Sequence, residues 1–189
     1  MKNLAKDLLA FDFLSNQSKV ELWLTYKDIK PVSAVALTHG NNNSDEAENK
    51  LRDWIVAAGL IIEKDNNSQN YFVSKKQDLI DEIKPIVFGN TKEDILKKSR
   101  LYGYPESTVL AAYRNFTDDK EGLPIGVALT KEDSEKIPWW IYVRYIVRVD
   151  HKKEDSMVAK IWREVIKADL PELDKEFEKE ILGAKISQM

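Results

Sequence analysis

The sequence predicts a mixed α/β fold, with a central mixed sheet of about five or six strands, helices packed on it and two helices at the C-terminus. Residues 32–63 read as a strand, a helix and a strand in succession, which is the main reason for this prediction. Other segments alternate apolar and polar side chains as strands do, and residues 158–181 follow the helical period. Since 189 residues suffice for one sizeable core, we expect a single domain over residues 1–189.

The first part of the chain is expected to hold a short helix and then a strand. Leucine and phenylalanine recur at helical spacing over residues 4–14, and the polar residues 15–18 are expected to end this helix. From Val20 to Tyr26, apolar side chains stand at every second position. This alternation predicts a strand with one buried face.

The next segment contains the predicted strand, helix and strand. Residues 32–38 are small and apolar on both faces, which is typical of a strand that is covered on both sides. The helix that follows has one apolar stripe and reaches its C-terminal cap at Gly59. Residues 60–62 and 71–73 are expected to pair as a hairpin around the turn-rich loop 65–68.

Helical patterns dominate most of the remaining chain. Residues 79–83 form a short apolar stripe. Residues 91–94, Thr-Lys-Glu-Asp, resemble a capping box for a helix that is expected to end at Gly103. The two C-terminal helices are expected over residues 158–166 and 173–181.

Residues 139–149 are compatible with two structures. Their alternating pattern predicts a strand, which we favour over a helix because β-branched and aromatic residues dominate. As a strand, the segment shows Tyr142, Arg144 and Arg148 on its second face, where a ligand or a partner is expected to bind. A solvated basic face is the alternative interpretation of the two arginines.

The composition excludes several classes of function. The chain has no cysteine, so it holds no disulfide, no thiolate zinc site, no iron–sulfur cluster and no cysteine nucleophile. The N-terminal residues resemble neither a signal peptide nor a membrane span, so we expect a soluble, cytoplasmic protein without a membrane partner. The 29 basic and 32 acidic residues are interleaved and sum to a net charge of −3, which argues against a nucleic-acid partner.

The sequence contains no familiar catalytic or cofactor motif. A Walker phosphate loop, a Gly-x-Gly-x-x-Gly turn, a nucleophile elbow and a His-Glu-x-x-His helix are all missing. The two histidines, His39 and His151, lie far apart in the sequence, which does not favour a metal site. We therefore expect no cofactor and no bound metal, and the pattern leaves open whether the chain is an enzyme.

The loop from Thr38 to Ser44 is the leading candidate for a small-ligand site. It leaves a buried strand and enters a helix, so it offers free backbone amides and the positive end of a helix dipole to an anion. The candidate contacts are Thr38, His39, Asn41 and Ser44, with His39 as an acid or a base. A solvated turn rich in asparagine is the alternative, and the one that we favour.

Residues 99–106, Ser-Arg-Leu-Tyr-Gly-Tyr-Pro-Glu, resemble a motif of a known family. The Gly-x-Leu-x-Gly-Tyr-Pro-x-Cys-Cys signature belongs to the domain-of-unknown-function family 483, an uncharacterised prokaryotic group, and the order of segments extends the resemblance over residues 50–166. Ser107 and Thr108 stand where that family often has a cysteine pair, so this chain is not expected to share any metal or redox chemistry of those cysteines. The family has no assigned activity, so the resemblance implies a fold and leaves the function open.

The same motif supplies three further candidate residues. One interpretation places Arg100, Tyr102 and Tyr104 at the rim of a pocket. The other, which we favour, is a corner between two helices that is packed by the two tyrosines. Gly103 suits a left-handed helix end, and Pro105 suits the start of the next helix.

These observations favour a non-catalytic binding or interaction protein of the cytoplasm, with a protein or a small anionic molecule as its partner. An enzyme that acts on an anionic substrate at the 38–44 loop is the first alternative. A weak nucleic-acid binder is the second, with the hairpin as a wing beside the basic residues Lys97, Lys98 and Arg100. The sequence leaves the oligomeric state open.

Overall fold

The fold is described from a computed structural model, which defines residues 3–38, 44–66, 68–105 and 152–186. The chain divides into two compact units, Met1–Pro85 and Ile86–Met189. The prediction that residues 1–189 form one domain stays a prediction, and each unit is described by itself.

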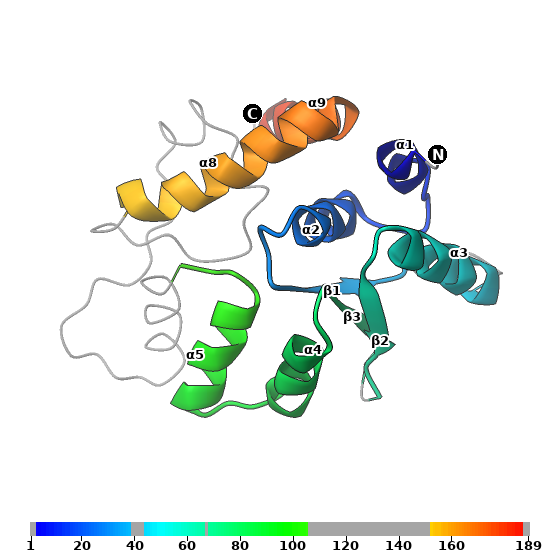
Figure 1. The fold of residues 1–189 in the computed structure, drawn as a ribbon. Helices are drawn as coiled ribbons and strands as arrows, with labels where there is room; N and C mark the ends of the chain where they lie inside the picture. Colours follow the sequence, from blue (N-terminus) through cyan, green and yellow to red (C-terminus); the bar gives the residue numbers. More distant parts are fainter. Residues whose placement is uncertain (1–2, 39–43, 67, 106–151, 187–189) are drawn as a thin grey trace. The chain divides into compact units, whose positions relative to one another are not determined.

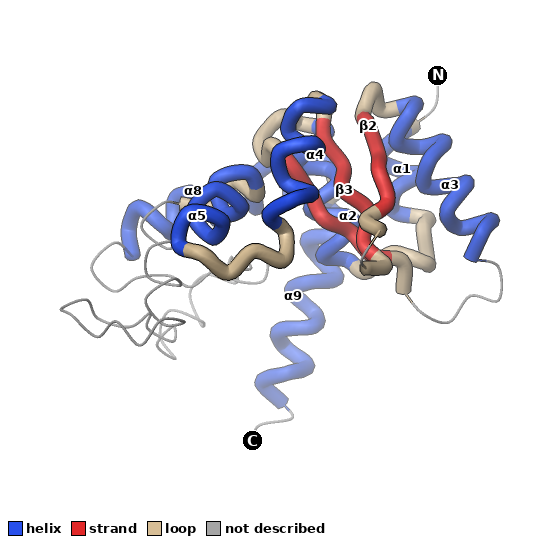
Figure 2. The backbone as a smooth tube through the Cα atoms, turned by 90° about the horizontal axis from the view of Figure 1, so that it is seen from below, coloured by secondary structure: helices blue, strands red, loops and turns tan. Residues whose placement is uncertain are grey.

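The first unit contains a sheet of three antiparallel strands (Figure 2). The strands are β1 (Val32–Ala36), β2 (Ile61–Lys64) and β3 (Asn70–Ser74), in the order β1-β3-β2. Phe72 on β3 lies opposite Ala34 on one side and Glu63 on the other. Because β1 and β2 are both antiparallel to β3, they run in the same direction on either side of it.

The predicted sheet of five or six strands is therefore wrong for the described residues, which form three strands, all antiparallel. The predicted hairpin of residues 60–62 and 71–73 is confirmed as β2 and β3. Residues 139–149, which were expected to add a strand, lie outside the described residues. Helices dominate the described part, and residues 20–26, which were predicted as a strand, are also helical.

The largest error concerns residues 20–26, which belong to helix α2 (Asn16–Tyr26) and not to a strand. Every residue from Ser18 to Thr25 is buried. A helix buried all round has no polar face, so its side chains do not reveal the 3.6-residue period. Ser15 caps this helix, because its Oγ accepts a hydrogen bond of 3.1 Å from the backbone N–H of Ser18. The polar residues 15–18 thus begin a helix, whereas the sequence predicts that they end one.

Helix α2 ends in a motif that usually needs glycine. Asp28 takes the left-handed conformation with φ 64°, and its backbone N–H donates to the carbonyl of Thr25. The N–H of Ile29 donates to the carbonyl of Leu24, which completes a Schellman motif. Because aspartate fills the glycine position, the sequence gives little sign that a helix ends here.

Helix α3 (Ser44–Ala57) connects β1 to β2, as the strand, helix and strand pattern predicts. Its end at Gly59 is confirmed: Gly59 has φ 69°, and the N–H of Leu60 donates to the carbonyl of Ile55 at 2.9 Å. The strand β3 lies between β1 and β2, so the unit is a split β-α-β arrangement.

The helices α2 and α3 cover one face of the sheet, and α4 (Gln77–Ile83) covers the other (Figure 1). On the first face, the hydroxyl of Ser33 on β1 donates to the Glu21 carbonyl of α2 at 2.9 Å and contacts the Thr25 hydroxyl at 2.6 Å. Tyr71 projects to the same face, where it reaches α3. The core of this unit lies between the sheet and these helices.

The helix α1 (Leu4–Leu9) precedes α2 and is shorter than the predicted span of residues 4–14. The chain then pairs with the end of β1, because Leu14 forms an isolated β-bridge with Leu37. After α4, a 3-10 turn (Lys84–Ile86) leads out of the first unit.

The second unit contains α5 (Lys92–Leu101), and Thr91 caps it as predicted: the Thr91 hydroxyl accepts from the Asp94 N–H at 3.1 Å and donates to the Asp94 carboxylate at 2.6 Å. Gly103 has φ 72° at the predicted helix end. The two predicted C-terminal helices are α8 (Lys152–Asp169) and α9 (Pro171–Ile186).

The helices α8 and α9 pack as a hairpin. Arg163 on α8 donates to the two carboxylate oxygens of Asp174 on α9 at 3.1 and 3.4 Å. Such a two-pronged pair fixes the two helices against each other. No helix within the described ranges combines the length and the apolar character that a membrane crossing requires.

Candidate functional site

A pocket lies in the first unit between α3 and the segment that comprises α1 and the residues directly after it. Its volume is about 350 Å³, which falls in the range of small-molecule sites. We call it the α1–α3 pocket. Its lining residues are Leu4, Asp7, Ala10, Phe11, Asp12, Phe13, Lys50, Asp53, Trp54 and Ala57.

Two contacts hold the walls of the α1–α3 pocket in place. The indole N–H of Trp54 on α3 donates to the backbone carbonyl of Leu4 at 2.9 Å, which ties the start of α1 to α3. The backbone N–H of Thr38 donates to the carbonyl of Phe13 at 2.9 Å, which ties the segment after α1 to the end of β1. The pocket is therefore bounded by segments that are fixed before any ligand arrives.

Aromatic rings form a large part of the pocket wall. Phe11 and Phe13 stack with their ring centroids 4.7 Å apart. Trp54 is only 3% exposed, and its ring meets Tyr26 of α2 edge to face at 6.5 Å. These contacts give the wall a rigid aromatic surface.

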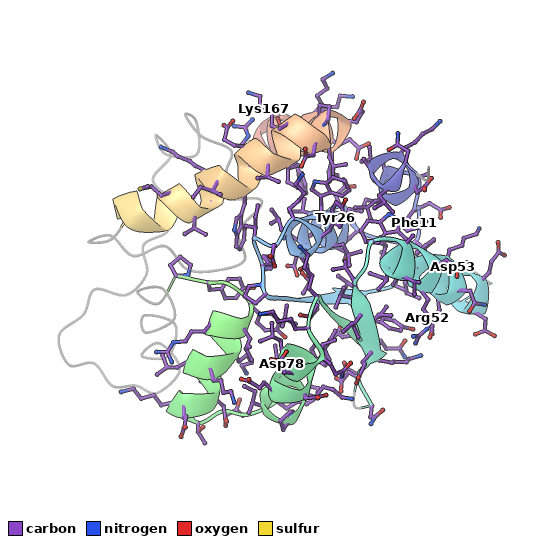
Figure 3. The ribbon with its side chains drawn as sticks, viewed as in Figure 1. Phe11, Tyr26, Arg52, Asp53, Asp78 and Lys167 are labelled. Carbon is purple, nitrogen blue, oxygen red and sulfur yellow. The ribbon has the colours of Figure 1, made fainter. Side chains whose placement is uncertain are left out.

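The charged residues of the pocket are mostly acidic. Asp7 lies on α1, Asp12 follows it, and Asp53 lies on α3; Figure 3 shows Phe11 and Asp53 on these neighbouring elements. Within the described ranges, none of these three carboxylates takes part in an ion pair. They stay available to a ligand of positive charge.

Lys50 is the one basic residue among the lining residues. Its ammonium lies 2.7 Å from Glu46 one turn earlier on α3. The hydrogen bond with Glu46 raises the pKa of Lys50 above its ordinary value, and the nearby Asp12 contributes in the same direction. Lys50 thus stays charged and offsets part of the negative charge of the pocket.

The arrangement of donor groups does not suit a metal ion. Among the residues that the structure describes, no three histidine or acidic side chains converge as metal ligands. The pocket also contains no phosphate-binding loop, since its polar groups are carboxylates and one lysine. Its chemistry is that of an aromatic cavity with an acidic border.

A second polar group lies between α3 and the sheet, and we call it the Glu48 cluster: Glu48, Arg52, Lys64 and Tyr71. The hydroxyl of Tyr71 donates to Glu48 at 2.5 Å, and two nitrogens of Arg52 donate to the same carboxylate at 2.7 and 2.9 Å. The ammonium of Lys64 lies 3.5 Å from Glu48 and 5.4 Å from the centre of the Tyr71 ring. All four side chains are thereby engaged with one another.

The electrostatics of the Glu48 cluster are those of a structural network. The hydrogen bond from Tyr71 lowers the pKa of Glu48, and Arg52 and Lys64 add to this effect against the cost of burial. Burial and the neighbouring carboxylate raise the pKa of Tyr71. Near neutral pH, Glu48 is ionised and Tyr71 is protonated, so the pair does not exchange a proton there.

The predicted loop site can be compared with the structure only at its ends. Thr38 is exposed, and Ser44 begins α3. His39 and Asn41 lie outside the described residues. Thr38 is hydrogen-bonded to a lining residue of the α1–α3 pocket, but it does not itself line the pocket.

The predicted surface of Tyr142, Arg144 and Arg148 also lies outside the described residues. Their role as a binding surface therefore stays a prediction.

Tyr102 and Tyr104 lie where the helix-corner interpretation places them. Their rings are 5.9 Å apart, and the N–H of Tyr104 donates to the carbonyl of Ser99 across Gly103. Arg100 is exposed on α5. None of the three lines the α1–α3 pocket.

The basic group proposed for nucleic acid is partly engaged within the fold. Lys98 donates to the backbone carbonyls of Val87 and Gly89, both at 3.1 Å. A lysine that holds a loop in this way is less available to phosphate groups, which does not favour the nucleic-acid alternative.

Sequence reasoning missed the α1–α3 pocket entirely. None of the lining residues of the pocket is among the candidate contacts that the sequence predicted. The pocket depends on a contact between residues fifty positions apart, from Trp54 to Leu4, which no local pattern reveals. The pair Phe11 and Phe13 around an acidic residue was the available signal, and it is weak.

Comparisons of the chain with models of protein families, with curated proteins and with solved structures found no match. The resemblance of residues 50–166 to the domain-of-unknown-function family 483 accordingly stays a prediction.

Proposed function

We propose that the protein is a non-catalytic, small-molecule-binding protein of the cytoplasm, and that its binding site is the α1–α3 pocket. The observation that carries this proposal is a cavity of about 350 Å³ with a fixed aromatic wall and a few polar groups at its border. Sites for small molecules commonly have this composition. The absence of cysteine fits the reducing cytoplasm.

The polar groups of the pocket support binding in preference to catalysis. A general acid or base works best when a neighbour tunes its pKa and a partner orients it. Within the described residues, no ion pair orients the carboxylates of Asp7, Asp12 and Asp53. An enzyme that uses His39 in the 38–44 loop remains the alternative proposal, and mutation of His39 tests it separately.

A substitution that fills the pocket tests the proposal. Ala57 lines the pocket at the end of α3, and its neighbour Val56 is 73% exposed and does not line it. We expect Ala57→Trp to fill the cavity and weaken ligand binding at least about tenfold, a change of about 1.4 kcal/mol. Val56→Trp adds the same side chain to the same helix and is expected to leave binding unchanged.

The measurement is a screen of small fragments by saturation-transfer NMR, followed by titration of each hit. Wild-type protein and Val56→Trp should give the same hits, and Ala57→Trp should lose them. Thermal unfolding of the three proteins checks that each is folded. Hits that survive Ala57→Trp, or a screen without hits, would contradict the proposed binding site.

A further inference from the structure

We propose that the ligand of the α1–α3 pocket is a small organic cation with an apolar or aromatic body. This inference rests on the proposed function, namely that the pocket binds a small molecule. It follows from the charges at the border of the pocket and from the rings in its wall.

The charge balance of the pocket favours a cation. Asp7, Asp12 and Asp53 supply three negative charges from two sides of the cavity, and Lys50 supplies one positive charge. The charge of Lys50 is already shared with Glu46 at 2.7 Å. A positively charged ligand thus meets an attractive potential, and an anionic ligand meets a repulsive one.

The aromatic wall favours an organic cation over a metal ion. Ammonium groups bind favourably over aromatic faces, and an apolar body gains further by leaving water. Phe11 is partly exposed at the pocket, and Trp54 is held in place by Leu4 and Tyr26. A metal ion would need several carboxylates at one point, and no such group occurs among the described residues.

Three probes of similar shape and different charge test the inference. They are 2-phenylethylamine, 2-phenylethanol and 3-phenylpropanoate, which are positive, neutral and negative at neutral pH. We expect the amine to bind at least about tenfold more tightly than the alcohol, and the acid to bind most weakly, in titrations at low ionic strength. Raising the salt concentration should weaken the binding of the amine and leave the binding of the alcohol unchanged.

Substitutions at the border should change the affinity for the amine in opposite directions. Asp53→Asn is expected to weaken it about two- to fivefold, as is typical of one partly exposed charge pair. Lys50→Met is expected to tighten it by a similar factor, because it removes the competing positive charge. Asp78→Asn is the matched control, since Asp78 is exposed on α4 and does not line the pocket (Figure 3).

The outcomes separate this inference from the proposed function. If the alcohol binds as tightly as the amine and Ala57→Trp abolishes both, the pocket is a binding site but the inference of a cation is wrong. The inference of a cation is also wrong if Lys50→Met weakens the binding of the amine. If no probe and no fragment binds in a way that Ala57→Trp disrupts, the proposed function itself fails.

Discussion

Helix α3 carries charged side chains into two different surroundings. Glu48 and Arg52 reach Lys64 and Tyr71 of the sheet and are engaged by them. Asp53, one position after Arg52, borders the α1–α3 pocket and has no ion-pair partner within the described residues. The same helix thus supports a closed polar network on one side and an open acidic border on the other.

The two surroundings separate charges that stabilise the fold from charges that are available for binding. A charge that is surrounded by its own partners contributes to folding, and its removal leaves those partners unsatisfied. A charge at the border of a cavity contributes little to folding and leaves its interaction free energy for a ligand. The Glu48 cluster and the α1–α3 pocket should therefore respond to mutation in opposite ways.

The largest expected difference is in the free energy of unfolding. Glu48→Ala removes the carboxylate that accepts from the Tyr71 hydroxyl and from Arg52. Tyr71 is only 3% exposed, so its hydroxyl is left without this acceptor in a buried position. We expect Glu48→Ala to cost about 1.5–3 kcal/mol in urea unfolding. Asp53→Ala, on the same helix, is expected to change stability by no more than about 0.5 kcal/mol. Equal losses in the two variants would contradict the distinction between the two sides of α3.

A smaller difference is expected in the dependence of stability on pH. The pKa of Glu48 in the folded protein is lowered from 4.5, so its contribution is present above the unfolded value and is lost as the pH falls through the lower folded value. Glu63 follows the same rule, because the hydrogen bond from Lys84 lowers its pKa. When the pH falls from about 5 to about 3, the free energy of unfolding of Glu48→Gln should therefore decrease less than that of the wild type.

The matched control for the pH experiment is Asp53→Asn, which should lose stability on acidification as the wild type does. Urea unfolding midpoints measured across that range provide the comparison. If Asp53→Asn and Glu48→Gln flatten the pH dependence equally, the two sides of α3 are electrostatically alike, and the distinction between them is wrong.

The smallest expected difference concerns two ion pairs of α3 with the same spacing and the same distance. Arg52 and Glu48 are 2.7 Å apart, as are Lys50 and Glu46. The first pair is less exposed and belongs to the Glu48 cluster, so Arg52→Met should cost about 1 kcal/mol. Lys50→Met should cost at most about 0.3–0.5 kcal/mol. Chemical unfolding of both variants measures this, and a larger loss for Lys50→Met would contradict it.

The sequence predicted those parts of the fold that depend on neighbouring residues. The hairpin of β2 and β3, the end of α3 at Gly59 and the cap of α5 at Thr91 each require only local chemistry. Residues 20–26 were predicted wrongly because burial on all sides of α2 hides its period and because Asp28 replaces the expected glycine. Tertiary packing determined the secondary structure of that segment, and the sequence pattern does not reveal tertiary packing.

The candidate site could not be predicted for a related reason. The α1–α3 pocket needs Trp54 to reach Leu4 and needs Phe13 to join the segment beside Thr38. Neither contact follows from composition or spacing. Of the residues that the sequence did single out, His39 and Arg144 lie outside the described residues, so their predicted role in binding stays a prediction. Thr38, Tyr102 and Tyr104 are described and do not line the pocket.

The most direct test of the binding site is a titration of ¹⁵N-labelled protein with 2-phenylethylamine, followed by heteronuclear NMR. The indole N–H of Trp54, assigned with a Trp54→Phe variant, and the backbone amides of residues 4–13 and 50–57 are expected to shift as one saturable process. The amides of Lys64 and Tyr71 in the Glu48 cluster are expected to stay in place. Shifts that are centred on the Glu48 cluster, or no saturable shift at Trp54, would contradict a binding site between α1 and α3.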